Sequence, residues 1–350
     1  MFTSIADKFE AAVFNVYENC ARQLFELQPL DRATIAMTSS IKVHLAIIGF
    51  GKMGQAVAAQ AARLGHFANG QPLRISVIDS QVEEARSAFL ALYPLFGEIC
   101  ELDFVNASAK SAEVNELLQD WASEKGTLLT VAICLDNDTL NVTRALTIAG
   151  KLQRHNVPVL VRMEEEAGLA SLLVCDGACH PAVKYIRAFG QIDRVCALGR
   201  LLSKEQDRRA RRLHERYVAD ARKDPNKSAS DPTLLDWEKL PESYKDSNRQ
   251  VSDHLPVKLR AIGMSDGQPL TRDFTKKEIE ILARMEHARW IAERLLAGWR
   301  YAPGAKCEEA MTNPNLVPWS KLDKKIKDFD RNIVREMARW LREPIRGSNT

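Results

Sequence analysis

The sequence has no long hydrophobic run and little net charge, and each absence excludes a class of protein. Charge-free apolar runs such as Thr127–Leu135 have the length of a strand, far short of the roughly 20 residues that a membrane-spanning helix needs. The formal net charge is only +3 over 350 residues, so overall charge gives no reason to expect a nucleic-acid partner. Asp7, Lys8 and Glu10 stand where a signal peptide would need an apolar core. We therefore expect a cytoplasmic protein with no membrane-inserted segment.

Cysteine pairs and catalytic motifs are also missing. The seven cysteines are scattered, odd in number and form no C-x-x-C pair, which is the usage of a reducing compartment. The one cluster, Cys175, Cys179 and His180, matches no standard zinc spacing, so we expect no metal site. The motifs H-E-x-x-H and Tyr-x-x-x-Lys are both absent. The sequence therefore gives no catalytic constellation and favours a protein that is not an enzyme.

Between residues 41 and 200, β-branched runs alternate with helical stretches. Strands are predicted at residues 42–50, 73–79, 100–107, 127–136, 157–163 and 183–190, and helices at 52–65, 80–93, 111–125, 138–155 and 168–176. Strands that alternate with helices of this length form βαβ units and a parallel sheet covered on both faces. The predicted fold is an α/β Rossmann-type, doubly wound parallel sheet followed by a smaller, mostly α-helical domain.

The flanking segments are helical. Ile5, Phe9, Val13 and Tyr17 recur at a spacing of four and predict an amphipathic helix over residues 5–27. After residue 200 we expect a charged, solvated connecting helix, two helices around Pro241, a helix that opens with a capping box at residues 275–278 and ends at residue 298, and a long final helix. The predicted domains are residues 1–40 (helix and connector), 41–200 (nucleotide-binding), 201–232 (charged helix and linker) and 233–350 (helical).

A glycine motif separates the first predicted strand from its helix. Gly49, Gly51 and Gly54 form G-x-G-x-x-G, and the next strand ends on Asp79. Gly49 permits the tight turn, Gly51 lets a pyrophosphate approach the backbone, and Gly54 brings helix and strand close together. The free N–H groups of the helix N-terminus attract the phosphates. A carboxylate at position 79 accepts the ribose hydroxyls and favours NAD or another adenine nucleotide over NADP. The alternative is a loop that kept its glycines for packing.

The same block resembles the regulator-of-potassium-conductance (RCK) family, also called KTN or TrkA-N. The matching segments are "HLAIIGFGKMG", "ISVID", "ICLDNDTLNV" and "VPVLVRM", the last of which ends the fifth strand at Arg162. The resemblance implies a regulatory domain that binds NAD, NADH or an ATP-type nucleotide, often as a dimer, and gates ion transport. In the family the third strand usually ends in an acid, where this sequence has Asn106. The implied site residues are Gly49, Phe50, Gly51, Lys52, Met53, Gly54, Asp79, Asn106 and Asp136.

The predicted helical domain contains an unusual group of aromatic and charged residues. Leu282, Glu286, Trp290 and Arg294 fall at a spacing of four on one helix. Three more rings, Trp299, Tyr301 and Trp319, lie in loops and are expected to converge on that helix. Aromatic rings with an arginine and a glutamate can stack a flat base and bind its edge. The alternative is a small core in which the rings simply pack and Glu286 pairs with Arg294.

These residues resemble the RyR domain, the repeat found in ryanodine receptors and in many bacterial proteins. The match includes "EHARW", "GWRYAP" and "NPNLVPWSKLDKKIKDFDRN" and extends over residues 233–341. The resemblance implies a ligand-sensing module for nucleotides or nucleotide derivatives, with no catalytic activity. The implied ligand-binding residues are Glu286, Trp290, Arg294, Trp299, Tyr301 and Trp319. The loop "APGAKCEEAMT" departs from the family, because it lacks the usual basic-rich stretch.

Three functional hypotheses follow from these patterns. We favour a cytoplasmic nucleotide sensor that forms a homodimer or a higher homo-oligomer and acts on a partner, by family analogy a membrane transport protein involved with potassium. The alternative is an NAD-dependent oxidoreductase with a helical substrate domain. A third interpretation, nucleic-acid binding through the arginines of residues 205–223, is weakened by interspersed acids at a spacing of four. His66, at the end of the glycine-loop helix, is expected to act as a cation at the helix C-terminus.

Overall fold

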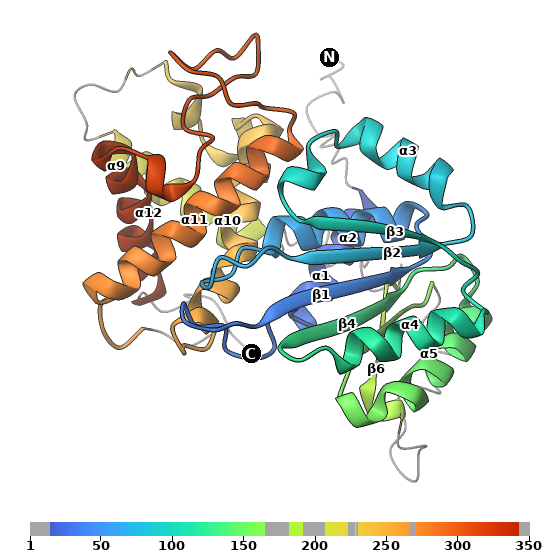
Figure 1. Ribbon diagram of the computed structural model, residues 1–350. Helices are drawn as coiled ribbons and strands as arrows, with labels where there is room; N and C mark the ends of the chain where they lie inside the picture. The colour runs from blue at the N-terminus through green and yellow to red at the C-terminus, as the bar shows by residue number, and fades with distance from the viewer. Residues whose placement is uncertain are drawn as a thin grey trace, which may run out of the picture.

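Six parallel strands form a single sheet in the order β3-β2-β1-β4-β5-β6 (Figure 1). The computed structural model describes residues 15–164, 182–191, 207–222, 228, 230–266 and 270–342. The strands are β1 (Lys42–Ile48), β2 (Arg74–Asp79), β3 (Glu101–Asn106), β4 (Thr127–Ile133), β5 (Val159–Arg162) and β6 (Ile186–Phe189). This strand order confirms the Rossmann-type fold class predicted from the sequence.

Helices cover both faces of the sheet, because alternate residues of each strand point to opposite sides. In β1, Val43, Leu45 and Ile47 belong to the core beneath one set of helices, whereas Ala46 and Ile48 belong to the core beneath the other. The first set is α1 (Val16–Leu27), α2 (Lys52–Leu64) and α3 (Val82–Leu92), and the second is α4 (Ala112–Ser123) and α5 (Asp138–Leu152). Both layers are visible in Figure 1.

Helix α1 confirms part of the amphipathic N-terminal helix. It begins after Asn15, whose side chain accepts hydrogen bonds from the backbone N–H groups of Tyr17 and Glu18. Its buried face consists of Cys20, Ala21, Leu24 and Phe25. Residues 5–14 of the predicted helix lie outside the described residues.

The C-terminal region is helical, as predicted, but its boundaries differ around Pro241. It contains α9 (Arg208–Ala221), α10 (Glu242–Ala261), α11 (Lys276–Leu296) and α12 (Lys324–Arg342). The prediction of two helices around Pro241 is wrong, because the described segment before this proline forms only single helical turns at Pro232–Leu234 and Trp237–Lys239. Proline lacks an N–H group and suits a helix start, so α10 begins directly after it.

Helix α11 has the predicted signals at both ends. The side chain of Thr275 accepts from the backbone of Glu278, and the Glu278 side chain accepts in return from the backbone N–H of Thr275. The helix stops before Gly298, which has a positive φ of 84° that glycine adopts without strain.

The sheet and the C-terminal helices share one continuous hydrophobic core. Residues of α2, α10, α11 and α12 belong to the same buried cluster as one face of the sheet. Two bidentate ion pairs join the parts: Arg22 with Asp253 at 2.7 and 2.9 Å, and Arg260 with Asp31 at 2.9 and 2.7 Å. Helix α2 packs on β1 and also contacts α10 and α11, so it links the two regions (Figure 1).

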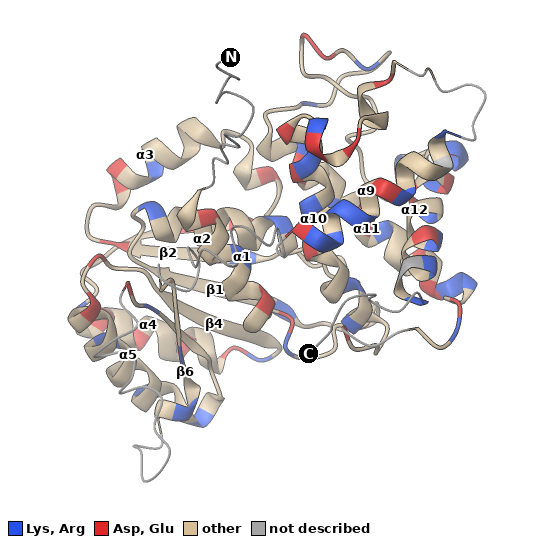
Figure 2. Cartoon of the chain, turned by 180° about the vertical axis from the view of Figure 1, so that it is seen from behind, with Lys and Arg blue, Asp and Glu red and all other residues tan. Residues whose placement is uncertain are grey.

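Helix α9 is less solvated than the sequence predicts. Ala210, Leu213 and Val218 are buried, and the helix packs on α10. Its arginines pair with acids from several elements, for example Arg209 with Asp266 at 3.0 Å. Figure 2 shows basic and acidic residues interleaved along these helices. Among the described helices, none combines the length and apolar character needed to cross a membrane.

Candidate functional site

The three glycines of the loop between β1 and α2 have different surroundings. Gly49 has a φ of +91°, and a Cβ there would lie 2.8 Å from Leu135 Cδ2. A Cβ on Gly54 would lie 2.2 Å from the carbonyl oxygen of Gly49. A Cβ on Gly51 would instead fit without a clash, because it would make only an ordinary contact of 3.7 Å with Asp136 Oδ2. Gly49 and Gly54 are therefore required by the fold, whereas Gly51 leaves the loop open at the N-terminus of α2.

Gly54→Ala tests the packing role of the third glycine. We expect a loss of about 2–4 kcal/mol in the free energy of unfolding, because an added methyl group cannot fit against a backbone carbonyl without separating α2 from β1. Chemical denaturation measures the loss. Gly150→Ala is the matched control, because a Cβ on Gly150 meets no atom within 4 Å in the part of the chain that the structure describes, and alanine favours the helix. Equal stability of both variants would contradict the close approach.

Asp79 closes the loop from the end of β2. Its Oδ2 accepts from the backbone N–H of Phe50 at 2.7 Å, and its Oδ1 accepts from the N–H of Gln81 at 2.8 Å. A carboxylate has about four lone-pair positions, so two remain for further donors. Asp79 therefore holds the loop in shape and also has lone pairs left for a ligand. A substitution at this position would disturb both the loop conformation and ligand binding.

The other predicted loop residues divide into buried and exposed side chains. Phe50 is 1% exposed, and its ring packs against Phe89 and Phe104 at centroid distances of 5.0 and 5.7 Å. Met53 is 3% exposed, so it too offers a ligand only its backbone. Lys52 is exposed on the first turn of α2, and Asn106 is exposed at the end of β3, opposite Asp79 in the strand register.

Asp136 and Arg162 form an ion pair beside the loop, at the ends of β4 and β5. The Arg162 side chain is 10% exposed and also donates to the carbonyl oxygen of Leu135 at 3.3 Å. The buried amide of Asn141 donates to the carbonyl oxygens of Leu135 and Arg162 at 2.9 and 3.0 Å. This amide fixes the ends of β4 and β5 relative to each other. The ion pair borders the glycine loop where the sheet reverses its strand order, because Asp136 Oδ2 lies 3.7 Å from the position of a Cβ on Gly51.

Two tryptophans of the second predicted site converge on one arginine. The Arg294 guanidinium lies 5.9 Å from the ring centroid of Trp290 and 5.6 Å from that of Trp299. The Lys306 ammonium lies 5.2 Å from the Trp299 centroid. We call Trp290, Arg294, Trp299 and Lys306 the aromatic–cation cluster. Lys306 comes from the loop that lacks a basic-rich stretch, which is why sequence reasoning missed it.

Trp319 joins the cluster indirectly, through a histidine that the sequence did not single out. His287 stacks on Trp290 at 5.7 Å and meets Trp319 edge-on at 5.8 Å. Its Nε2 lies 2.9 Å from the carbonyl oxygen of Val317, and its Nδ1 lies 3.3 Å from Asp330 Oδ2. Tyr301 is 55% exposed on the loop, apart from this buried arrangement.

Glu286 does not face these rings. It is 1% exposed, and its carboxylate pairs with Lys258 Nζ at 2.6 Å and Arg289 Nη2 at 2.7 Å. Arg289 also donates to Glu293 at 2.6 Å, and Arg294 lies 3.4 Å from the other oxygen of Glu293. The ion pair between Glu286 and Arg294, which belonged to the alternative packing interpretation, is therefore wrong. Helical spacing placed them about two turns apart on one row, but Glu286 pairs with Lys258 of α10, whereas Arg294 lies over Trp299 at the start of the loop.

His66 is also placed differently from the prediction. Burial, followed by the nearby charge of Arg289, lowers its pKa to about 4, so the ring is neutral and is not a cation at the end of α2. Its carbonyl oxygen accepts from Nε2 of His254 on α10 at 3.1 Å. Burial lowers the pKa of His254 well below its usual value. These neutral rings form part of the contact between α2 and the C-terminal helices.

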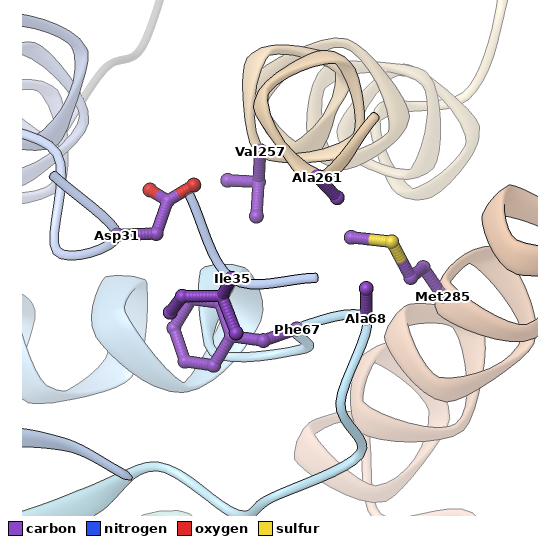
Figure 3. Close-up of a pocket in the computed structure, with 7 residues that line it drawn as sticks. All are labelled: Asp31, Ile35, Phe67, Ala68, Val257, Ala261 and Met285. Carbon is purple, nitrogen blue, oxygen red and sulfur yellow. The ribbon is translucent and has the colours of Figure 1, made fainter. Parts of the chain in front are cut away.

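A narrow gap lies in the same contact region (Figure 3). It is lined by Asp31, Ile35, Phe67, Ala68, Val257, Ala261 and Met285. The gap has no room for a water molecule, and Asp31 is already paired with Arg260. It is therefore a packing irregularity and not a ligand site.

Comparison with known families assigns part of the chain. Residues 270–343 match the RyR domain, which includes α11, the aromatic–cation cluster and α12. The upstream part of the predicted resemblance, residues 233–269, lies outside this match. Cys175, Cys179 and His180 lie outside the described residues. Within the parts that are described, no group of three or more histidine, cysteine or acidic side chains is placed to hold a metal ion.

Proposed function

We propose that this chain is a non-catalytic regulatory protein that senses two ligands. The first is NAD(H) or another adenine nucleotide at the glycine loop, and the second is a nucleotide-like ligand at the aromatic–cation cluster. The observation that carries the proposal is the contrast among the three glycines: only Gly51, at the N-terminus of α2, would accept a Cβ without a clash. A glycine without a packing role at a helix N-terminus is typical of a phosphate-binding loop.

The geometry beside the loop supports a TrkA-N-like regulatory domain. Asp79 keeps free lone pairs for ribose hydroxyls, and its negative charge disfavours a 2′-phosphate. Arg162, held at the mouth by Leu135, supplies a cation for a phosphate group. On the family analogy, the protein is a cytoplasmic homo-oligomer that regulates a transport protein such as a potassium transporter.

The aromatic–cation cluster supports the second ligand. Two indole rings with two flanking cations can hold a flat, anionic molecule through stacking and charge. The Arg294 side chain is 29% exposed and that of Lys306 is 48% exposed, so both reach solvent. The match to the RyR domain covers these residues. Tyr301, on the same loop, is available as a further contact.

Helix α2 offers a route between the two ligands. Its first residue follows Gly51, and its last turn leads to His66, which contacts His254 on α10. The side chain of Gln60, on α2, donates to Asp253, which lies on α10, at 3.3 Å. A nucleotide that favours one position of α2 would shift the equilibrium of the C-terminal helices by its differential affinity for the two states.

Thermal unfolding with NAD, NADH, ATP, AMP and ADP-ribose tests the proposal. A ligand at about 100 times its Kd adds roughly 2.7 kcal/mol to the stability of the folded state. We expect Gly51→Ala to abolish the shift caused by the first ligand without changing the stability of the free protein. This variant is a cleaner probe than Asp79→Ala, because Asp79 also holds the loop. Gly150→Ala is its control.

The second site needs its own pair of variants. We expect the double variant Arg294→Gln/Lys306→Gln to abolish the shift caused by the second ligand only. Lys327→Gln is the matched control, because Lys327 lies 5.9 Å from the Trp319 ring, outside the cluster. If no nucleotide shifts unfolding, the sensor proposal fails. Oxidation of bound NADH on addition of a small carbonyl compound would instead favour the alternative, an NAD-dependent oxidoreductase with a helical substrate domain.

A further inference from the structure

Asp136 and Arg162 are unequally buried, although they form one ion pair. The Asp136 side chain is 86% exposed, whereas that of Arg162 is 10% exposed. The guanidinium is anchored by the carbonyl oxygen of Leu135, and Asn141 fixes the backbone on both sides. The carboxylate is therefore the partner that is free to move.

The second oxygen of Asp136 borders the open face of the glycine loop. Asp136 Oδ2 lies 3.7 Å from the position of a Cβ on Gly51, and among the described residues beyond its chain neighbours no other atom approaches that position within 4 Å. A second carboxylate, that of Glu164, lies 3.8 Å from Arg162 Nη2. An anion that approaches Gly51 is therefore attracted by the guanidinium of Arg162. The charge of that guanidinium is already balanced by the carboxylates of Asp136 and Glu164.

We propose that Asp136 occupies the place that a ligand phosphate takes against Arg162, and that its charge sets the affinity and the phosphate-number preference of the glycine-loop site. The inference rests on the proposed function of that loop. It gives Asp136 the role of a competitor, the opposite of the contact expected from the sequence. Because the repulsion grows with ligand charge, Asp136 penalises a triphosphate more than a monophosphate.

Asp136→Asn tests the inference, because it removes the charge and keeps the size of an exposed side chain. We expect affinity for ATP to rise about tenfold, with a smaller gain for ADP and the smallest for AMP. The gain should shrink at high ionic strength, since the site is open to solvent. Isothermal titration calorimetry at two salt concentrations measures both effects on the full chain.

Asp138→Asn is the matched control. Asp138 carries the same charge two residues away, and its carboxylate accepts from the backbone N–H of Glu164 at 3.0 Å, a bond that asparagine can keep. We expect the affinity of Asp138→Asn for ATP to change by less than about twofold. Adding Arg162→Gln to Asp136→Asn should cancel the gain in affinity, because the variant then has no guanidinium at position 162 to bind the ligand phosphate.

The outcomes separate the inference from the proposed function. If the unsubstituted protein binds a nucleotide and Asp136→Asn binds it equally or more weakly, only the inference is overturned. A gain of the same size in Asp138→Asn also overturns it, because general charge would then explain the effect. If Asp136→Asn binds a nucleotide and the unsubstituted protein binds none, the inference is supported. If neither protein binds any nucleotide, both the inference and the proposed function are rejected.

Discussion

Glu286→Gln is expected to lower the free energy of unfolding by about 3–5 kcal/mol, because it leaves buried cations without a matching anion. The side chains of Lys258, Glu286 and Arg289 are 0, 1 and 2% exposed. Burial opposes ionisation of Glu286, but the charges of Arg289 and Lys258 outweigh it and lower the pKa of the carboxyl group to about 2. In the variant Arg289 keeps Glu293, whereas Lys258 loses its ionic partner.

A second substitution distinguishes charge imbalance from simple loss of packing. Lys258→Met removes the unmatched ammonium, so the double variant Lys258→Met/Glu286→Gln should recover part of the lost stability. Glu280→Gln is the control on the same helix. Glu280 pairs with Arg331 at 2.8 Å, but its side chain is 32% exposed, so we expect a loss below about 1 kcal/mol. Urea unfolding measures all four proteins, and a Glu286→Gln loss as small as that of Glu280→Gln would contradict the assignment.

The sheet region was predictable because its signals are local. The apolar run of β1, the glycines after it and Asp79 at the end of β2 all lie within one βαβ unit, where spacing alone fixes their arrangement. The capping box of α11 is equally local, since Thr275 and Glu278 are three residues apart. Such features need no knowledge of which elements pack together.

The candidate second site was predictable only in part, because its contacts depend on tertiary packing. Trp290, Arg294 and Trp299 converge as expected, whereas Tyr301, only two residues beyond Trp299, is exposed. Glu286 lies on the same helix as Trp290, but its ionic partner Lys258 comes from α10. A spacing of four shows which residues share a helix face and does not show which neighbour that face meets.

The contact between α2 and α10 was the least predictable feature. Nothing in the sequence around His66 and His254 indicates that the carbonyl of one meets the ring of the other across 188 residues. The glycine-loop helix was expected to end beside a cationic His66. In the structure it ends in a shared core, which explains why a titratable ring there is neutral.

Lowering the pH from 7 to 5 is expected to destabilise the protein by about 4 kcal/mol through His44 and His66, and His254 adds to this loss in the same direction. Burial lowers the pKa of His44 to about 3 and that of His66 to about 4, and it lowers that of His254 well below its usual value. Unfolded histidine titrates near 6.5. Each ring therefore contributes stability that is fully present above pH 6.5 and falls by about 1.4 kcal/mol per pH unit below it.

The geometry explains why these rings resist protonation. Within the described residues, His254 Nδ1 and His66 Nε2 are buried and have no hydrogen-bond partner, so a proton gained there finds no acceptor. Lys258 and Arg289 are nearby cations that add repulsion, and Glu286 offsets part of it for His66. Protonation at this contact therefore acts directly on the packing of α2 against α10.

The pH range itself separates histidines from carboxylates. Glu286, with its pKa lowered to about 2, loses its contribution only as the pH falls below about 4.5, so the range from 6.5 to 5 reports the histidines. We expect His254→Gln to reduce the pH dependence in this range, because glutamine does not titrate and can still donate to the His66 carbonyl. Urea unfolding at half-unit intervals measures the slope. A stability that stays constant from pH 7 to 5 would mean that these rings reach solvent, and that α2 does not end in a shared core.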